Sequence, residues 1–372
     1  MYNFTTWGMR VVVAVPAFYL GTAFVPALGA QQTAAHDPRA VIAESQAIAA
    51  GGLHELKAVE IGGIPQWISV RGNDPDNPIL LFLHGGPGSP MMPESWTFQR
   101  PWEDFFTVVQ WDQRGAGKTF SSAKRQPDNS MTIAKMQADA EELIEWLRHT
   151  YGKGKIFLMG HSWGSVLGVK VAQHHPEWLY AYIGVGQVVN GTRNEAVGYQ
   201  QTLLRAESVG NRSAIRELKS IAPYPEPDGR IPLSKTQIER KWDVALGGMV
   251  YGKAKDDAAL TWALSPDYSR YDIESTQRGE LSSVVILLPQ IASVNFDDIA
   301  EFKCPVFFFA GADDRTTPES VAEEFYNRIQ APQKKFFKIE RAAHYVVNEA
   351  PGEVLMDLVQ HVRPLYQSDR LP

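Results

Sequence analysis

A serine between two glycines stands where an apolar run meets a helix-like run. The segment Gly160-His161-Ser162-Trp163-Gly164 follows the apolar residues 156–159 and precedes residues 165–172, whose composition suits a helix. On a sharp strand-to-helix turn a serine hydroxyl is thrust out of the sheet, and the flanking glycines avoid clashes with neighbouring backbone. This placement predicts that Ser162 is a nucleophile.

A serine hydroxyl attacks efficiently only when a positioned base takes its proton, and an imidazole is the usual base. Of the nine histidines, His344 lies in a loop after the apolar run 336–339 and before a C-terminal helix expected to begin near Gly352. The others fall in the N-terminal arm, near expected helix ends or beside other motifs. We therefore expect His344 to be the base.

The imidazole in turn needs a carboxylate that holds its tautomer and stabilises its charge. Asp313 and Asp314 both follow the apolar run 306–310. Asp314 is preferred because it lies four residues before Pro318, the expected first residue of a helix with Thr317 as its cap. Asp313 remains the alternative, and the expected chain order is serine, aspartate, histidine.

The oxyanion formed on attack must meet preorganised N–H donors. The residue after the nucleophile, Trp163, offers one. The segment His84-Gly85-Gly86-Pro87-Gly88 directly follows the apolar run 80–83 and offers the second, since glycines let the backbone approach a substrate. Gly86 is the expected donor, and Gly85 is the second choice and a substrate contact.

Short apolar runs alternate with helical periodicity, which predicts an α/β fold with a mainly parallel sheet flanked by helices. A helix is expected where apolar residues recur at three- and four-residue spacing over residues 133–147. This alternation of apolar runs and helical stretches is interrupted over residues 190–298, which we interpret as an inserted helical lid. The expected strands cover residues 79–83, 106–111, 156–159, 180–185, 306–310 and 336–339.

Residues 1–30 resemble a signal peptide, because Arg10 precedes an uncharged run over residues 11–30 that ends in small residues. Export after cleavage is expected, and an uncleaved membrane anchor is the alternative. The core then comprises residues 31–189 and 299–372, with a short helix beginning at Asp37-Pro38 and ending by Gly51-Gly52. Cys304 is the single cysteine and is expected to be a buried structural thiol.

The amino-acid composition and net charge indicate which classes of binding partner to expect. The 372 residues are 44% hydrophobic, with a formal net charge of -6 and a sequence pI near 5.9, so nucleic acid is not an expected partner. Small molecules or short peptides are expected instead. No cofactor or metal is implied, because the sequence has neither an H-E-x-x-H motif nor a Cys/His ligand cluster. The sequence does not specify an oligomeric state.

Three linked motifs resemble the proline iminopeptidases and their α/β-hydrolase relatives. They are His84 to Gly88, Asp112-Gln113-Arg114-Gly115-Ala116-Gly117 and Gly160 to Ser165. The resemblance covers about residues 61–188 and 305–364. It implies the α/β-hydrolase fold, a helical lid over the site, and release of an N-terminal residue, usually proline, from peptides. Asp112 to Gly117 would then form a structural loop at the pocket edge.

The lid departs from that family pattern. The iminopeptidases carry a W-x-x-W-E segment whose glutamate binds the substrate ammonium, whereas Trp242-Asp243-Val244-Ala245-Leu246 places leucine at the glutamate position. A desolvated ammonium needs a charged partner, which Leu246 cannot be. Asp243, Glu239 or Glu280 could substitute from another position. Trp242 is a candidate for lining the substrate pocket, with lid packing as its alternative role.

The expected chemistry is acyl transfer through an acyl-enzyme on Ser162. An exported aminopeptidase of the proline iminopeptidase type is the first hypothesis. A carboxylesterase or amidase for uncharged small molecules is the second, motivated by Leu246 and the aromatic lid, and a non-catalytic binding protein is the third. Serine rather than aspartate at the turn disfavours dehalogenase and epoxide-hydrolase chemistry, by family resemblance.

Overall fold

The computed structural model describes residues 37–254 and 258–366. The expected leader, residues 1–30, lies outside the described residues. Within them, no helix combines the length and apolar character needed to cross a membrane.

One eight-stranded sheet forms the centre of the molecule, with the strand order β1-β2-β4-β3-β5-β6-β7-β8. The first strand pairs are antiparallel, and all pairs from β3/β4 to β7/β8 are parallel. The central strands are buried on both faces, which is why they are continuous apolar runs in the sequence. The strands are β1 (Leu53–Ile61), β2 (Ile64–Gly72), β3 (Ile79–Leu83), β4 (Thr107–Asp112), β5 (Ile156–His161), β6 (Leu179–Val185), β7 (Val306–Gly311) and β8 (Lys334–Ile339).

The α/β fold expectation is confirmed, and every expected strand is present within two residues at each end. The β1–β2 hairpin was not predicted. Most side chains of β1 are partly exposed because it is an edge strand, so it lacks the continuous apolar run of a central strand. Its turn is made by Gly62 and Gly63, which both adopt positive φ.

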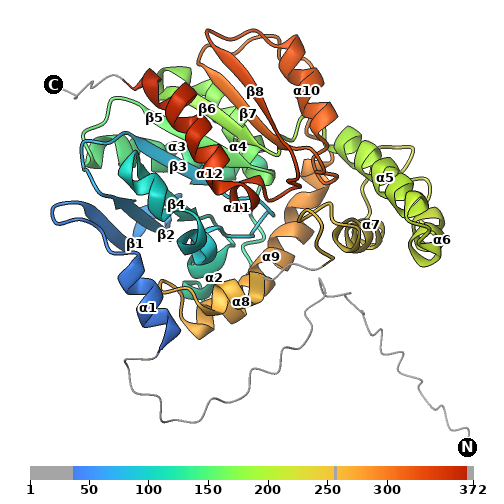
Figure 1. Cartoon of the computed structure of the whole chain (residues 1–372), viewed down its shortest axis with the longest axis horizontal. Helices are drawn as coiled ribbons and strands as arrows, with labels where there is room; N and C mark the ends of the chain where they lie inside the picture. The colour runs from blue at the N-terminus through green and yellow to red at the C-terminus, as the bar shows by residue number, and fades with distance from the viewer. Residues whose placement is uncertain (1–36, 255–257, 367–372) are drawn as a thin grey trace, which may run out of the picture.

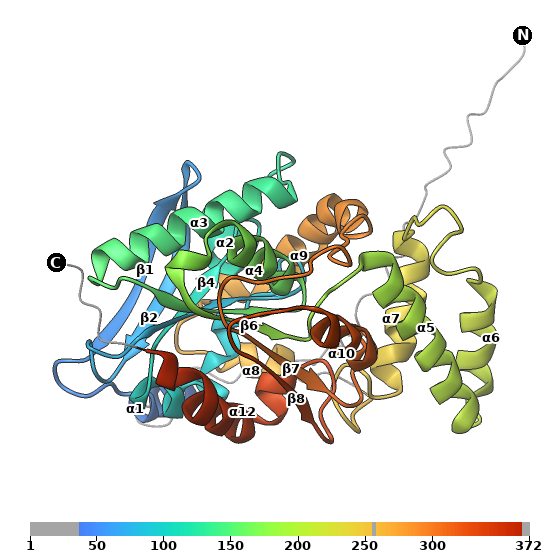
Figure 2. The ribbon, with the colours of Figure 1, turned by 90° about the horizontal axis from the view of Figure 1, so that it is seen from above.

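Helices cover both faces of the sheet (Figure 2). One apolar core joins the sheet to α3, α4 and α10, and a second core on the opposite face includes Trp102, Val354 and Leu358. The helices outside the insertion are α1 (Pro38–Ser45), η2 (Met92–Thr97), η3 (Arg100–Asp104), α2 (Gly117–Ser122), α3 (Ile133–Thr150), α4 (Trp163–His174), η4 (Pro176–Trp178), α10 (Glu319–Arg328), α11 (Val346–Glu349), α12 (Pro351–Asp357), η5 (Leu358–Val362) and η6 (Arg363–Leu365).

Helix α1 begins at Pro38 with Asp37 as its cap, as expected, but it ends at Ser45 rather than at Gly51-Gly52. The backbone beyond it is drawn into other bonds: the Gln46 carbonyl accepts from Arg71, and the Ala49 N–H donates to Asn73 Oδ1 at 2.9 Å. These bonds compete with continuation of the helix.

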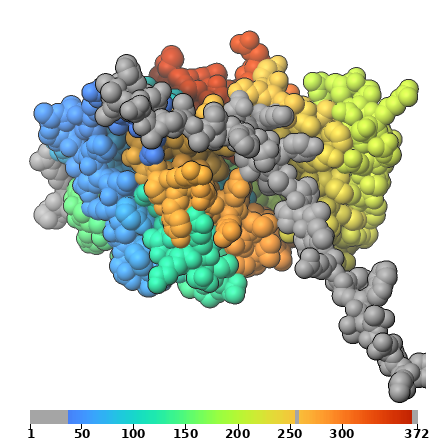
Figure 3. All heavy atoms as spheres, turned by 90° about the horizontal axis from the view of Figure 1, so that it is seen from below, coloured from blue at the N-terminus to red at the C-terminus, as the bar shows by residue number. Residues whose placement is uncertain are grey.

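The chain between β6 and β7 is helical throughout its described regular structure, and it gathers beyond the carboxyl ends of the strands (Figure 1). Helices α5 to α7 share a small apolar core that includes Tyr199, Leu218 and Tyr224. Figure 3 shows the orange surface of α8 and α9 lying between the blue N-terminal strands and the yellow-green α5 to α7 region. These helices are α5 (Gly191–Ser208), α6 (Arg212–Ser220), α7 (Leu233–Ala245), α8 (Ala258–Ala263) and α9 (Arg270–Ile291).

The two ends of this insertion meet each other. Asn190 and Asn295 form an isolated antiparallel bridge, with Gly191 N–H donating to the Val294 carbonyl at 2.9 Å and Phe296 N–H donating to the Val189 carbonyl at 2.9 Å. The insertion therefore leaves the sheet and returns to it at almost one point.

Candidate active site

Ser162 occupies a strained turn between β5 and α4. Its backbone has φ 52° and ψ −120°, a region that side-chain-bearing residues rarely adopt. The Ser162 N–H donates to the Val185 carbonyl at 2.9 Å, and the Ser162 carbonyl accepts from the Ser165 N–H at 2.8 Å and the Ser165 hydroxyl at 2.6 Å. These bonds hold the turn in the geometry that exposes a nucleophile's hydroxyl.

The two glycines of the motif are required by contacts with backbone. A Cβ on Gly164 would lie 2.0 Å from the Leu83 carbonyl oxygen, and a Cβ on Gly160 would lie 2.5 Å from the Gly164 carbonyl oxygen. Real Cβ atoms do not approach backbone so closely, so both positions exclude any other residue without movement of the sheet. The glycine spacing in the sequence thus reflects close packing of α4 on β3 and β5.

His344 and Asp314 form a buried pair. The His344 Nδ1 lies 2.9 Å from Asp314 Oδ2, and because a carboxylate can only accept here, Nδ1 carries the proton. Asp314 also accepts from the N–H groups of Thr316 at 2.9 Å and Thr317 at 2.8 Å, and from the Thr317 hydroxyl at 2.7 Å. The structure thus brings Asp314 to His344, whereas Asp313 is partly exposed.

Thr317 was expected to cap the following helix, and that expectation is wrong. Helix α10 begins at Glu319 with Pro318 in the cap position and no side-chain cap bond. The Thr317 hydroxyl instead lies 2.7 Å from Asp314 Oδ2 and 3.2 Å from His344 Nδ1. The hydrogen bond that the Thr317 hydroxyl donates to the buried carboxylate directs this side chain towards Asp314 and not towards the helix end.

The surroundings keep Asp314 ionised. Burial by itself favours the neutral acid, but the nearby His344 charge and the hydrogen bonds from His344 and Thr317 outweigh it, so the pKa of Asp314 is lowered. With Nδ1 held by Asp314, His344 has Nε2 available as a base. Among the described residues no hydrogen bond joins the Ser162 hydroxyl to this ring, and such bonds often form only when substrate is bound.

His161, the residue before Ser162, packs against His344. Its Nε2 lies 2.9 Å from the His344 carbonyl oxygen, which makes Nε2 the protonated nitrogen, and the two rings are 4.8 Å apart. Burial lowers the pKa of His161 to about 3, with the neighbouring His344 charge acting in the same direction. His161 is therefore a neutral donor that fixes the His344 backbone, a role that the sequence analysis did not identify.

The glycine-rich segment after β3 lies against the serine. A Cβ on Gly85 would stand 3.1 Å from the Ser162 Cβ and 3.2 Å from the His161 Nδ1. Gly86 adopts φ 111°, a conformation that favours glycine. Trp163 is the first residue of α4, so its N–H has no partner within the helix. These are the N–H groups expected to bind an oxyanion.

Gln113 connects the glycine-rich segment, through His84, to the turn after Ser162, through Trp163. Its Nε2 donates to the His84 carbonyl at 3.0 Å, its Oε1 accepts from Trp163 Nε1 at 3.0 Å, and its N–H donates to His84 Nε2 at 3.2 Å. Burial lowers the pKa of His84 to about 4, which keeps the ring neutral and its Nε2 an acceptor. Gln113 was expected only as part of a structural loop, and these partners were not predicted.

The same loop contains a buried carboxylate, Asp112. Its Oδ2 accepts from the Tyr268 hydroxyl and from the Lys118 N–H at 2.6 Å, while its Oδ1 has no hydrogen-bond partner among the described residues. Burial raises the pKa of Asp112 from 3.8 to about 7, against the lowering effect of the Tyr268 and Lys118 bonds. Asp112 thus ties the loop to Tyr268 in the insertion.

The insertion also contacts the acid loop. On α7, Asp243 Oδ1 accepts from Arg315 Nε at 3.1 Å and its Oδ2 accepts from the Thr316 hydroxyl at 2.9 Å, while Arg315 Nη2 donates to the Leu246 carbonyl at 2.9 Å. Arg315 directly follows Asp314, and both Asp243 and Arg315 are buried. The insertion and the loop that carries Asp314 are therefore joined by buried polar bonds.

The three carboxylates considered as ammonium partners have different surroundings. Asp243 is paired with Arg315, and Glu239 is buried between Arg240 and the Thr202 hydroxyl. Glu280, on α9, is partly exposed, and its Cα would lie 2.9 Å from a Cβ on Gly88. Of the three, Glu280 thus has its backbone beside the glycine-rich segment after β3.

Trp242 makes its contacts within the insertion. Its Nε1 donates to Glu217 Oε2 at 3.0 Å on α6, and its ring packs against the core of α5 to α7. These contacts match the alternative role of lid packing, and lining of the substrate pocket stays a prediction.

One group of His, Cys, Asp or Glu side chains within the described ranges has atoms close enough together to hold a metal ion: Glu141, His174 and His175. It shares no member with Ser162, His344 and Asp314. Cys304 is a free, buried thiol whose pKa burial raises to about 12, as expected of a structural cysteine.

Comparison with known proteins gives consistent similarities. Residues 78–351 match the family model described as alpha/beta hydrolase fold. The chain is 32% identical over 313 residues to the probable aminopeptidase YbaC of Bacillus subtilis (strain 168), covering 83% of this chain and 96% of that protein. It is 36% identical over 119 residues to the proline iminopeptidase of Neisseria gonorrhoeae, covering 32% of this chain and 36% of that protein.

The fold is also similar to that of a solved structure. The proline iminopeptidase of Mycobacterium smegmatis has a TM-score of 0.61 at 17% identity, with 84% of this chain and 98% of that one covered.

Proposed function

The chain belongs to the α/β-hydrolase fold family, in its proline iminopeptidase-like branch, and on that premise we propose that it is a serine aminopeptidase. In this proposal Ser162 is the nucleophile, His344 the general base and acid, and Asp314 the carboxylate that orients His344. The observation that supports it most is the joint geometry of the strained Ser162 turn and the buried His344–Asp314 pair, 2.9 Å apart.

The residues suggest the following sequence of steps. His344 Nε2 takes the Ser162 proton as the hydroxyl attacks the scissile carbonyl, and Asp314 stabilises the resulting imidazolium. The N–H groups of Gly86 and Trp163 bind the oxyanion. His344 then protonates the leaving amine, and water attacks the acyl-enzyme in a second round with the same base.

For the amine of the substrate we propose Glu280. The residue stands on α9, and its Cα would lie 2.9 Å from a Cβ on Gly88 in the glycine-rich segment after β3. We propose that residues 190–298 act as a lid, since Arg315 and Thr316 tie them to the loop of Asp314. Glu280→Gln should raise KM for a peptide with a free amino terminus and leave ester hydrolysis unchanged.

A carboxylesterase or amidase for uncharged small molecules is the second candidate. It is favoured by Leu246, which stands at the position of the family's ammonium-binding glutamate, and whose carbonyl is used by Arg315. An uncharged acyl group needs no carboxylate partner in the pocket.

Parallel assays separate these candidates. A prolyl arylamide, its N-blocked form and a short p-nitrophenyl ester are compared for the wild-type chain, Ser162→Ala and the exposed-serine control Ser208→Ala. An aminopeptidase cleaves only the free-amine arylamide rapidly, and an esterase cleaves the ester regardless of an amine. Failure of a fluorophosphonate to label folded wild-type protein at Ser162 would overturn both enzyme proposals in favour of a binding protein.

We also propose that the chain is exported, on the basis of Arg10 and the uncharged run over residues 11–30. Mass spectrometry of the protein purified from its native host measures the mature amino terminus. A start near residue 31 in an extracytoplasmic fraction is the expected result. A chain that begins at Met1 in the cytosol contradicts the proposal, and one that begins at Met1 in the membrane fraction indicates an anchor.

A further inference from the structure

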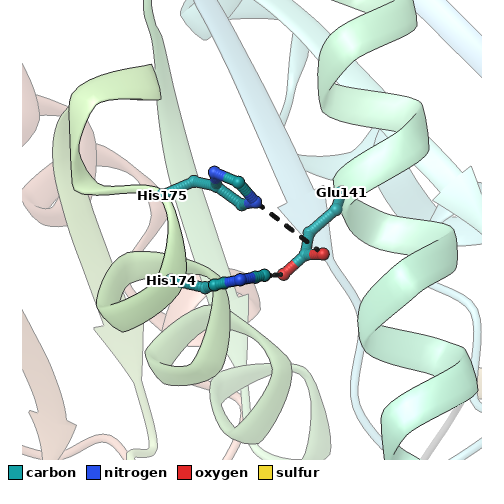
Figure 4. A group of neighbouring side chains, drawn as sticks. All are labelled: Glu141, His174 and His175. Carbon is teal, nitrogen blue, oxygen red and sulfur yellow. Dashed lines mark hydrogen bonds and ion pairs between the residues drawn. The ribbon is translucent and has the colours of Figure 1, made fainter.

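Two histidines and a glutamate meet on the face of the molecule where α3 passes the end of α4 (Figure 4). Glu141 lies on α3, His174 is the last residue of α4, and His175 follows it. The His174 Nδ1 is 2.8 Å from Glu141 Oε1, and the His175 Nε2 is 3.9 Å from Glu141 Oε2. One ligand atom from each residue lies within 4.8 Å of the others.

The ring of His175 lies between two carboxylates, Glu177 and Glu141. Its outward Nδ1 lies 3.2 Å from Glu177 Oε1 and donates to that carboxylate. The ring is stacked on Trp178 at 3.6 Å between centroids with an interplanar angle of 2°, which holds its direction. The inward Nε2 is thereby directed at Glu141 Oε2, 3.9 Å away, so a cation placed between these two atoms would contact both.

Glu177 and Gln137 have the roles that outer partners have at metal sites. A histidine that binds a metal commonly donates its other N–H to a carboxylate, as His175 does to Glu177. The Gln137 Nε2 donates to Glu141 Oε1 at 2.8 Å and orients that carboxylate. The arrangement thus contains both the ligands and the groups that would orient them.

We propose that Glu141, His174 and His175 form a binding site for a borderline divalent cation of the Zn²⁺ type. Two imidazoles and one carboxylate form a ligand set that binds zinc in preference to magnesium or calcium. Tetrahedral zinc with bonds of about 2.0–2.1 Å separates its ligand atoms by about 3.3 Å. The ligand atoms lie between 2.8 Å and at most 4.8 Å from one another, so they would have to move by up to about 1.5 Å, which rotation about the side-chain torsions can provide. Because His174 is exposed, a water can fill the fourth position.

The position of the site defines what the ion would do. Helix α4 begins directly after Ser162 and ends at His174, and its twelve residues put the site about 18 Å along the helix from the nucleophile. The ion takes no part in the hydrolytic reaction. It links the carboxyl end of the nucleophile-bearing helix to α3 and stabilises their packing.

Zinc titration of the full-length protein tests the proposal. The protein is prepared without a histidine tag and freed of metal with a chelator, then titrated with zinc chloride in a calorimeter and melted with and without zinc. We expect one zinc ion per chain, and at a free zinc concentration a hundred times Kd a rise in Tm of about 4 °C. Visible absorption of the Co²⁺-substituted protein should show a site with nitrogen and oxygen ligands.

Matched variants locate the ion. His174→Ala and Glu141→Gln should weaken zinc binding at least about tenfold and so reduce the rise in Tm at the same zinc concentration to about half or less, and Glu177→Gln should weaken binding by about 10- to 100-fold. His149→Ala and Glu145→Gln, exposed residues on α3 outside the group, should bind zinc as the wild type does. Since His174 is exposed, its removal should leave folding intact, which circular dichroism checks. No zinc uptake by the wild type, or equal uptake by His174→Ala and His149→Ala, overturns the proposal, whatever the hydrolytic activity.

Discussion

Replacement of Asp112 by asparagine should stabilise the protein more as the pH rises. Asp112 is buried, and its folded-state pKa is about 7 against 3.8 outside the fold. The folded chain thus binds a proton that the unfolded chain has lost between these two values, so the stability contributed by this residue falls as pH rises towards 7. At 1.36 kcal/mol per pKa unit, wild type should lose about 3 kcal/mol relative to Asp112→Asn between pH 5 and pH 8.

Urea unfolding of both proteins at pH 5 and pH 8 measures this difference, because titrations elsewhere cancel in the comparison. Asparagine reproduces the shape of the protonated acid, and its oxygen can accept the bonds that Tyr268 and Lys118 donate to Oδ2. Tyr268→Phe is the matched variant. It removes a bond that lowers the pKa of Asp112, so it should enlarge the loss of stability between pH 5 and pH 8, whereas Asp112→Asn should abolish this loss. The reasoning is refuted if Asp112→Asn changes stability by the same amount at both pH values.

Three further predictions concern the serine turn and the acid loop. Gly164→Ala should destabilise the fold by about 3 kcal/mol or more in urea unfolding, because its Cβ would lie 2.0 Å from the Leu83 carbonyl oxygen. Arg315→Met should destabilise by about 3–5 kcal/mol through the unpaired buried Asp243, and the double variant Arg315→Met/Asp243→Leu should recover much of that loss. The lowered pKa of Asp314 should stabilise the fold above about pH 4, and this contribution should disappear as pH falls through the folded-state pKa, which acid unfolding of Asp314→Asn against wild type measures.

Controls for these variants come from the same chain. Gly352→Ala meets no atom within 4 Å and should be tolerated in α12, so equal destabilisation by Gly164→Ala and Gly352→Ala would contradict the packing argument. Additive losses in the Arg315 and Asp243 variants would show that the pair is not energetically coupled. An acid-unfolding profile of Asp314→Asn identical to that of wild type would show that Asp314 contributes no pH-dependent stability.

Local patterns in the sequence were sufficient to predict the central strands and the serine turn. Runs such as residues 79–83 and 156–159 are apolar throughout because both faces of those strands are buried, and the glycines at 160 and 164 mark backbone packing beside Ser162. Chain order then pointed to His344 and to Asp314. The edge strand β1 was not predicted, because its partly exposed residues do not form a continuous apolar run.

Residues that act through distant partners were not predictable in this way. His161 meets the backbone of a residue 183 positions away, and Arg315 meets Asp243 72 positions away, so neither pairing leaves a periodic trace in the sequence. Thr317 was misassigned for a related reason. Helix-capping rules consider only the adjacent helix, whereas its hydroxyl is taken by the buried carboxylate of Asp314.

The meeting of Asn190 with Asn295 makes the insertion a replaceable part of the molecule. Since departure and return share one bridge beside the sheet, natural sequence change can lengthen, shorten or exchange everything between them without displacing β6 or β7. The bonds that would have to be re-formed include Asp243 with Arg315, Tyr268 with Asp112, and Asp272 with Lys118 and Ser121. New substrate preferences could thus evolve, or be engineered by grafting a foreign helical segment at this junction, on an unchanged hydrolytic centre.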